Sequence, residues 1–315
     1  MHVATKGRVV LGPCESVWKE KSIYLGESLR RIYLDRIEAA GLVELASDAA
    51  SAKGEPGGAS KEESDKHFAW RFANSAGRSI YALADPEGKL QSVHGAISES
   101  FVDGDVVLVD IPSGSGAGAL GILACIFEHR KAGAAATLPL NVTIVAGDFS
   151  ARAGEHFDAL FEPLRLVFAS QAIFVSLARM HWDAMKIDTS AALIDQVIEK
   201  ARSADRVFLL VSNFSAALKD RDLKERFEHF VTQFSSRVKP FPNSLLWIEP
   251  NTSGAKELLP KVDSWIERFI AWFKGKGGER VKSAQYNMCD PFTEKVYLTG
   301  IVVLRCGTEG LPWST

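Results

Sequence analysis

From Gly104 onward the chain alternates short apolar runs with stretches whose apolar residues recur at helical spacing, and this alternation limits the possible folds more than any other feature. Strands that alternate with helices are typical of βαβ units, in which the strands pair in parallel and helices cover the sheet. The sequence therefore predicts an α/β fold. Its first five strands are expected within Val106–Asp110, Val142–Ala146, Ile173–Asp183, Val207–Val211 and Ser244–Ile248.

The last two apolar runs end this alternation. Ala284–Cys289 and Val296–Arg305 are separated only by a short stretch around Asp290–Thr293. A link this short permits antiparallel pairing and leaves no room for a crossover helix. The sequence thus predicts a mostly parallel seven-stranded sheet with helices on both faces and a C-terminal antiparallel β-hairpin.

The first hundred residues follow a different pattern. One helical stripe ends at Gly41, and a second helix, rich in aromatic residues and arginine, is expected over His67–Ala84. Between them, residues 46–66 contain no Val, Leu, Ile, Met or aromatic residue, so they cannot bury enough apolar area to offset their ordering entropy. We expect a small helical N-terminal region over residues 1–100, with a flexible loop at 46–66, followed by a Rossmann-like domain over residues 101–315.

The composition excludes several classes of protein. A net charge of −2 provides no global positive field that would attract nucleic acid or an anionic membrane. The longest apolar stretch, Gly118–Phe127, is about half the roughly 20 residues that a membrane-spanning helix needs. The N-terminus lacks the apolar core of a signal peptide, so a cytoplasmic protein is expected. The 4 cysteines form no CxxC pair and have no histidine at ligand spacing, which predicts free buried thiols and no metal site.

Polar residues follow each of the first four predicted strands, at the sheet edge where open α/β sheets bind ligands. Glycines after the first strand let the backbone approach a ligand and leave helix N-terminal amides pointing at it. A carboxylate after the second strand can accept both hydroxyls of a ribose, and one after the third can accept from an adenine amino group. The residues in question are Asp110, Pro112, Ser113, Gly114 and Gly116 after the first strand, Asp148 and Phe149 after the second, Asp183 after the third, and Ser212, Asn213 and Phe214 after the fourth.

This arrangement resembles the class I S-adenosylmethionine-dependent methyltransferases. Their first motif is an acid followed by alternating glycines at the end of the first strand. Here it reads Asp110-Ile111-Pro112-Ser113-Gly114-Ser115-Gly116, with Pro112 where the first glycine usually stands. The predicted C-terminal hairpin is also the usual ending of that family. The resemblance covers about residues 100–306.

The resemblance implies S-adenosylmethionine as the cofactor and a role for each strand end. Asp110, Gly114 and Gly116, with their neighbours Pro112 and Ser113, would hold the methionine portion. Asp148, followed by Phe149, would hold the ribose, and Asp183 would contact the adenine. The loop Ser212-Asn213-Phe214 would face the reacting methyl group. The methyl acceptor stays open among RNA, protein and small molecule.

Other interpretations of the same residues stay open. Instead of binding a ligand, Asp110 could simply cap the turn that follows it, and Asp148 could be a solvated loop acid. Asp188 competes with Asp183 for the adenine, and His181 could be a general base or a structural histidine.

Two other functions compete with methyl transfer. Gly114-x-Gly116-x-x-Ala119 matches the fingerprint of NAD(P)-dependent oxidoreductases, in which Asp148 would again hold a ribose. The acid Asp110 and the C-terminal hairpin argue against that function. A catalytically silent S-adenosylmethionine-binding module is the third possibility, because Pro112 and the loop after the fourth strand depart from the family pattern.

Overall fold

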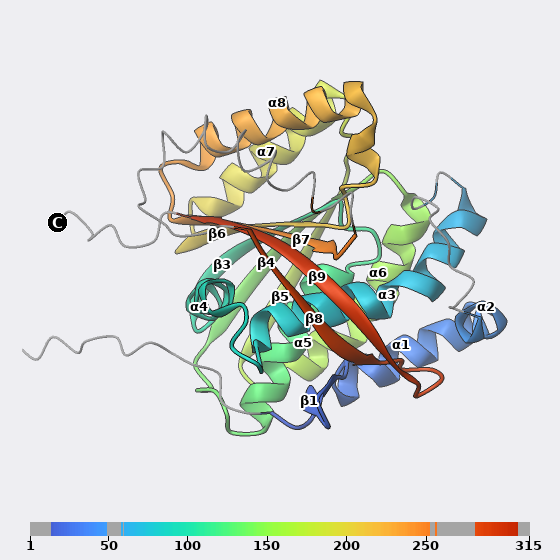
Figure 1. The fold of residues 1–315 in the computed structure, drawn as a ribbon. Helices are drawn as coiled ribbons and strands as arrows, with labels where there is room; N and C mark the ends of the chain where they lie inside the picture. Colours follow the sequence, from blue (N-terminus) through green and yellow to red (C-terminus); the bar gives the residue numbers. More distant parts are fainter. Residues whose placement is uncertain (1–13, 49–57, 59, 253–255, 257–280, 308–315) are drawn as a thin grey trace, which may run out of the picture.

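The computed structural model describes residues 14–48, 58, 60–252, 256 and 281–307. Its centre is a nine-stranded sheet in the order β1-β2-β8-β9-β7-β6-β3-β4-β5 (Figure 1). Five neighbouring strands pair in parallel: β3 (Gly104–Ile111), β4 (Leu140–Asp148), β5 (Ile173–His181), β6 (Arg206–Ser212) and β7 (Asn243–Pro250). β9 (Val296–Gly307) lies antiparallel between β7 and β8 (Val281–Cys289). The predicted mostly parallel α/β sheet with a C-terminal antiparallel hairpin is confirmed.

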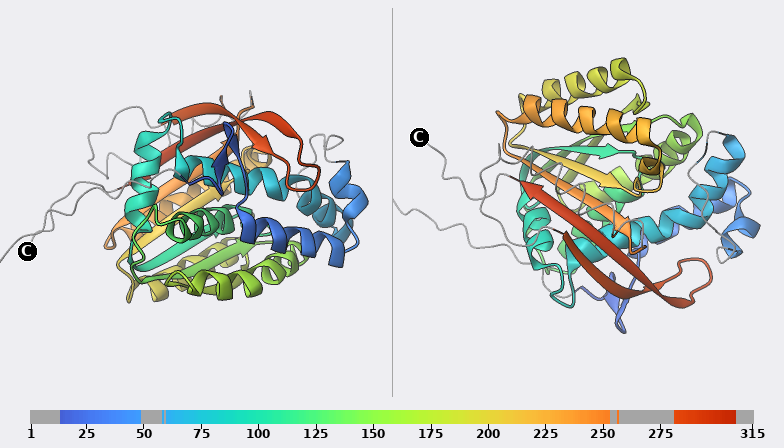
Figure 2. Two further views of the ribbon diagram at one scale, coloured as in Figure 1. Left: turned by 90° about the horizontal axis from the view of Figure 1, so that it is seen from below. Right: turned by 45° about the horizontal axis from the view of Figure 1, so that its top comes forward.

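Helices cover both faces of this sheet, as Figures 1 and 2 show. Alternate residues of β3 explain the two layers: Val106 and Leu108 belong to one hydrophobic cluster, whereas Val107 and Val109 belong to the other. Side chains of a strand alternate between faces, so a strand buried on both sides is apolar throughout. One face carries α5 (Ala117–Lys131) and α6 (Ala151–Ala169), and the other carries α7 (Ile187–Ala201) and α8 (Arg221–Val238).

Four helices precede the parallel strands: α1 (Glu27–Ala39), α2 (Val43–Ser47), α3 (Lys61–Ala84) and α4 (Gln91–Ser100). The long helix α3 packs directly on α5, where a Cβ atom at Gly121 would lie 2.7 Å from the backbone oxygen of Ala76. Only glycine permits this approach. Leu29 of α1, Phe72 of α3 and Leu108 of β3 therefore belong to a single buried cluster.

The N-terminal elements differ in detail from the sequence expectation. Two short strands, β1 (Trp18–Lys19) and β2 (Ser22–Ile23), extend the predicted sheet, and β2 pairs in parallel with β8. The segment 46–66 is helical at both ends, since α2 continues to Ser47 and α3 begins at Lys61; residues 49–57 and 59 lie outside the described residues.

Lys186 occupies the N-cap of α7, so Asp188 lies in the first helical turn. Apolar residues at helical spacing from Leu258 to Phe273 predict a helix after the fifth strand, and these positions fall outside the described residues.

Cys14 and Cys125 are free and buried, as predicted, while the free thiol of Cys289 is half-buried. Within the ranges that the structure describes, no helix has the length and apolar character needed to cross a bilayer.

Candidate active site at the carboxyl ends of the strands

The order of the strands reverses at β3. The chain runs from β3 outward through β4 to β5, then returns to the other side of β3 with β6 and continues outward to β7. The loops that leave β3 and β6 consequently diverge, and such a switch point is where open α/β sheets bind ligands. Asp110 lies in β3 one residue before its end, Asp148 ends β4, and Ser212 ends β6, so the sequence-predicted residues meet at this edge.

The turn between β3 and α5 depends on its two glycines. Gly114 and Gly116 have φ angles of +51° and +79°, a region that favours glycine. A Cβ atom at Gly116 would lie 2.4 Å from the ring of Phe157, whereas one at Gly114 would meet no atom within 4 Å. Gly116 therefore closes the turn against α6, and Gly114 faces open space.

A backbone hydrogen bond from Ser113 connects this turn to the neighbouring strand. The peptide bond before Pro112 is cis. The backbone N–H of Ser113 donates to the carbonyl oxygen of Gly147 at 2.9 Å, which ties the turn to β4. Helix α5 starts at Ala117, so its N-terminal amides lie at the carboxyl edge of the sheet, where they favour a negative or polar group.

Asp110 is completely buried beneath this turn. Its Oδ2 accepts from the backbone N–H of Ala119 at 3.4 Å, while its Oδ1 has no hydrogen-bond partner among the described residues. Burial raises the pKa of Asp110 well above its ordinary value, and the nearby charge of Asp148 acts in the same direction. An unpartnered buried carboxylate oxygen is costly, so the site gains from a ligand cation or donor placed beside it.

Asp148 is bonded to the glycine turn. Its Oδ2 accepts from the backbone N–H of Gly114 at 2.7 Å, and its Oδ1 accepts from that of Ser150 at 2.8 Å. Burial raises the pKa of Asp148, although these bonds oppose the rise. Each carboxylate oxygen can accept two hydrogen bonds, so capacity is left for two hydroxyl donors. Phe149, the next residue, is 47% exposed and offers an aromatic surface beside the carboxylate.

The third strand end supplies a polar residue with apolar neighbours. The half-buried Asp183 accepts from the backbone N–H of Met185 at 3.0 Å, and its Oδ2 lies 3.4 Å from Nζ of Lys186. Met185 and Ile187 are 44% and 51% exposed. Asp188 and His181 are exposed. Local contacts therefore use part of the hydrogen-bond acceptor capacity of the Asp183 carboxylate.

The loop after β6 is fixed from two sides. Asn213 has a φ angle of +55°; its Oδ1 accepts from Nη2 of Arg78 at 2.7 Å, and its Nδ2 donates to Oγ of Ser75 at 3.0 Å. On the other side, Oε1 of Glu249 accepts from the backbone N–H groups of Phe214 at 2.7 Å and Ser215 at 2.9 Å.

Glu249, which the sequence places at the end of the fifth strand, and Arg78 are not among the predicted site residues, and both have structural roles here. Glu249 is 1% exposed and also accepts from the indole of Trp247 and the hydroxyl of Ser215, both at 2.7 Å. Burial raises the pKa of Glu249. Arg78 is the only charged residue between Arg71 and Asp85 in the sequence, and this isolated charge is the one signal that could have identified it.

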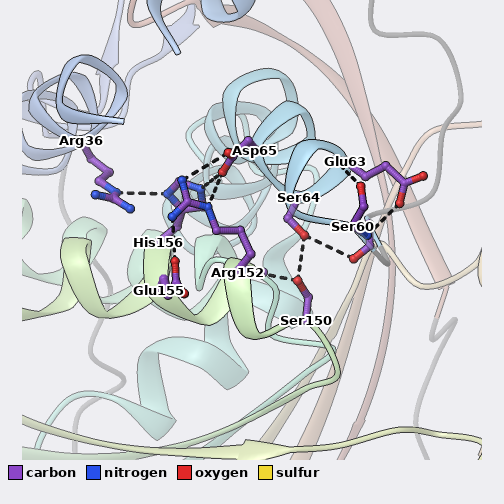
Figure 3. A network of polar contacts seen from close by, with 11 residues as sticks. Arg36, Ser60, Glu63, Ser64, Asp65, Ser150, Arg152, Glu155 and His156 are labelled. Carbon is purple, nitrogen blue, oxygen red and sulfur yellow. Dashed lines mark hydrogen bonds and ion pairs between the residues drawn. The ribbon is translucent and has the colours of Figure 1, made fainter. Parts of the chain in front are cut away.

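A polar network joins the start of α3 to α6 (Figure 3). Asp65 accepts from Arg152 at 2.6 Å and from Nε2 of His156 at 2.7 Å. The hydroxyls of Ser64 and Ser150 lie 2.8 Å apart. Because the backbone of Ser150 binds Asp148, this network connects α3 to the expected ribose site.

The described residues contain no group of three or more His, Cys, Asp or Glu side chains that could hold a metal ion. What they bring together is three carboxylates at adjacent strand ends around a glycine turn. This set suits a ligand that carries a cation or amine, vicinal hydroxyls and a planar ring.

No family model matches the chain, and no curated protein matches it. A protein of echinomycin biosynthesis that converts a disulfide bond into a thioacetal group has 12% identity and a TM-score of 0.33, covering 68% of this chain and 81% of its own. A candidate S-adenosyl-L-methionine-dependent methyltransferase from Methanococcus maripaludis has the same identity and TM-score, with coverage of 81% and 96%. Cofactor-bound Rv0187 from MTB has 9% identity and a TM-score of 0.30, with coverage of 85% and 97%. Likeness of this extent does not identify a reaction.

Proposed function

We propose that this protein is a methyltransferase that uses S-adenosylmethionine. The observation that carries the proposal is the bond from the Gly114 amide to Asp148, which unites the glycine turn after β3 with the acid after β4 at the switch point of the sheet. The closing hairpin, with β9 antiparallel between β7 and β8, agrees with the family that the motif resembles.

The chain's own residues fit the cofactor. Asp110 offers an unpartnered carboxylate oxygen to the methionine ammonium, and Gly114 leaves open space above the turn. Asp148 retains acceptor capacity for the two ribose hydroxyls, and Phe149 provides a face for the adenine. Asp183 would accept from the adenine amino group.

The protein's contribution to such a reaction is chiefly positioning. When bound, S-adenosylmethionine supplies a methyl group already activated by a sulfonium. The loop Ser212–Phe214 would orient the acceptor, and Glu249 and Arg78 keep this loop in one conformation. Holding two reactants in a productive geometry can supply several kcal/mol of the barrier, roughly 7–11 in favourable intramolecular cases. A base is needed only for an acceptor that arrives protonated.

Calorimetry with S-adenosylmethionine, S-adenosylhomocysteine and NADH tests the proposal. We expect binding of the first two ligands and none of NADH. Asp148→Ala should weaken S-adenosylhomocysteine binding roughly 10- to 100-fold, since it removes charge-assisted hydrogen bonds to the ribose. Asp183→Asn should weaken it more than the matched substitution Asp188→Asn, which alters an exposed acid in the first turn of α7.

Three outcomes would contradict parts of this proposal. Binding of NADH alone would favour the oxidoreductase that the Gly114-x-Gly116-x-x-Ala119 match suggests. Unchanged affinity in Asp148→Ala would remove the ribose assignment. Binding of both sulfur ligands, with no transfer of labelled methyl to any fraction of a cell extract, would favour a silent binding module.

A further inference from the structure

Arg78 is a buried cation without a counter-ion. Its side chain is 6% exposed, and it takes part in none of the ion pairs between described residues. Nη2 donates to the neutral oxygens of Asn213 at 2.7 Å and Ser75 at 3.2 Å, and the buried Nε has no hydrogen-bond partner. Burying a charge without pairing it is expensive, so a folded protein seldom leaves it in that condition.

A second buried arginine in the same molecule shows what a structural role requires. Arg130 is 4% exposed and also forms no ion pair between described residues, but its guanidinium donates to four backbone carbonyl oxygens at 2.7–3.3 Å. Arg130 therefore ties together the segments that precede β3, β4 and β5. Arg78 has no such set of acceptors. Its two hydrogen bonds described above both come from Nη2, and its Nε–H group has no acceptor within the described part of the chain.

The nearest acid does not supply the missing acceptor. Glu249 interacts electrostatically with Arg78, but its four hydrogen bonds come from Phe214, Ser215 and Trp247, and none comes from the guanidinium. On the same helix, burial and the nearby cations Arg71 and Arg78 lower the pKa of His67 to about 4.

The neighbours of Arg78 include the part of the C-terminal hairpin that extends beyond the carboxyl end of β7. Pro250 at the end of β7 pairs with Ile301, so the hairpin strands β8 and β9 extend past the carboxyl end of β7. Tyr286 and Tyr297 belong to this extension, and the ring of Tyr286 stacks on that of Tyr81, which lies one turn after Arg78 on α3, with ring centroids 4.2 Å apart. The buried hydroxyl of Tyr286 has no partner among the described residues, whereas that of Tyr297 donates to Asn74 at 2.8 Å.

We propose that Arg78 and the Tyr286 hydroxyl bind a carboxylate of a small-molecule methyl acceptor, beside the loop Asn213–Ser215 that follows β6. The carboxylate would accept from Nε of Arg78 and from the tyrosine, which satisfies both orphaned groups at once. That the carboxylate belongs to the methyl acceptor rests on the proposed function; that the site binds a carboxylate does not.

The charge and burial of the site favour a carboxylate over nucleic acid. One unpaired guanidinium balances one negative charge, which a carboxylate carries and a phosphate monoester exceeds. A nucleic-acid backbone requires a groove lined by several exposed cations, whereas Arg78 is buried and the whole chain has a net charge of −2.

The Nε–H resonance of Arg78 in ¹⁵N-labelled full-length protein reports this binding without any activity. Its assignment comes from its absence in Arg78→Lys. Acetate, benzoate and phenylacetate are titrated, each beside its uncharged amide, and inorganic phosphate is titrated separately. We expect at least one carboxylate to shift the resonance saturably and its amide to leave it unchanged.

Variants separate a ligand role from a structural one. Tyr286→Phe removes an unpartnered hydroxyl, so it should leave the denaturation midpoint unchanged or raised while weakening the carboxylate roughly 10-fold. Arg78→Lys should weaken it by roughly 10- to 100-fold, since an ammonium lacks the fork geometry. Arg130→Lys, the matched buried arginine, should leave the affinity unchanged.

Two results would overturn the proposal. One is the absence of a saturable shift with all three carboxylates, and the other is a shift caused by phosphate alone. A wild-type carboxylate affinity in Tyr286→Phe would remove the tyrosine from the site. If the proposed function is wrong, calorimetry will show no binding of S-adenosylhomocysteine to the wild-type protein, while the carboxylate titration still gives a saturable shift.

Discussion

Gly114 and Gly116 occupy the same turn with positive φ angles, yet different surroundings give them different roles. We predict that Gly116→Ala costs more than about 3 kcal/mol of the free energy of unfolding, because its methyl group would overlap the ring of Phe157. Gly114→Ala should cost only about 1–2 kcal/mol, the strain of a left-handed backbone. Urea denaturation of both variants measures the difference.

The same pair of variants separates folding from binding. The alanine methyl group at position 114 would enter the space above the turn, so S-adenosylhomocysteine affinity should fall although the protein stays folded. Equal losses of stability in the two variants would contradict the assignment of Gly116 to packing and Gly114 to the site.

At this scale the sequence indicates the acids and glycines because they follow apolar runs directly. Asp110 and Asp148 lie at strand ends, and the pattern of short runs places them there. Arg78 cannot be found in this way. Its partner Asn213 lies on another element, 135 residues further along the chain, and no spacing rule connects them.

At the scale of elements, the carboxylate of Asp65 on α3 forms the charged contacts with α6. Asp65 is 14% exposed, and burial raises its pKa, but hydrogen bonds from Arg152 and His156 outweigh burial and lower it. Nε of Arg36 donates to Nδ1 of His156 at 3.1 Å, so this imidazole is neutral and carries its proton on Nε2, toward Asp65.

We predict that Asp65→Asn lowers the free energy of unfolding by about 1–3 kcal/mol at pH 7, because charge-assisted hydrogen bonds are lost in a largely buried site. Hydrogen exchange should speed up first at the start of α3. Asp158→Asn is the matched control: its ion pair with Arg179 is exposed, with side chains 46% and 39% accessible, and should contribute less than about 0.5 kcal/mol.

The pH dependence of this difference has a definite sign. The folded pKa of Asp65 lies below its unfolded value, so its contribution is complete above the unfolded pKa and is lost as the pH falls through the folded pKa. Wild type and Asp65→Asn should therefore converge in stability as the pH falls through the folded pKa of Asp65. A difference that persists there would mean that the carboxylate charge is not the source.

β3 and β6 can be predicted from sequence because their buried centres, Val106–Val109 and Val207–Val211, are continuous apolar runs. β2 cannot, since a two-residue strand exists only through its pairing with β8 at the other end of the chain. The start of α3 is a different case. Ser60 and Glu63 form a capping box whose sequence signature was available, but the lack of apolar residues around it concealed the helix.

At the scale of the whole molecule, the N-terminal helices and the sheet share one hydrophobic cluster. It contains Tyr33 of α1, Phe68 of α3, Leu120 of α5 and Ile144 of β4, all buried. Helix α5 is buried along most of its length because α3 covers the side that the sheet does not. Neither part has a core that is complete without the other.

This shared core has a consequence for unfolding. We predict that the full chain unfolds in urea in one transition, with the N-terminal helices and the sheet losing structure together, since cooperative units follow contiguous packing. Native-state hydrogen exchange should give α3 and α5 the same opening free energy, because the close contact of Gly121 with Ala76 cannot be kept by either helix alone. If α3 instead opens at lower denaturant than β3 and β4, then the first hundred residues fold as a separate layer on a sheet that is stable without them.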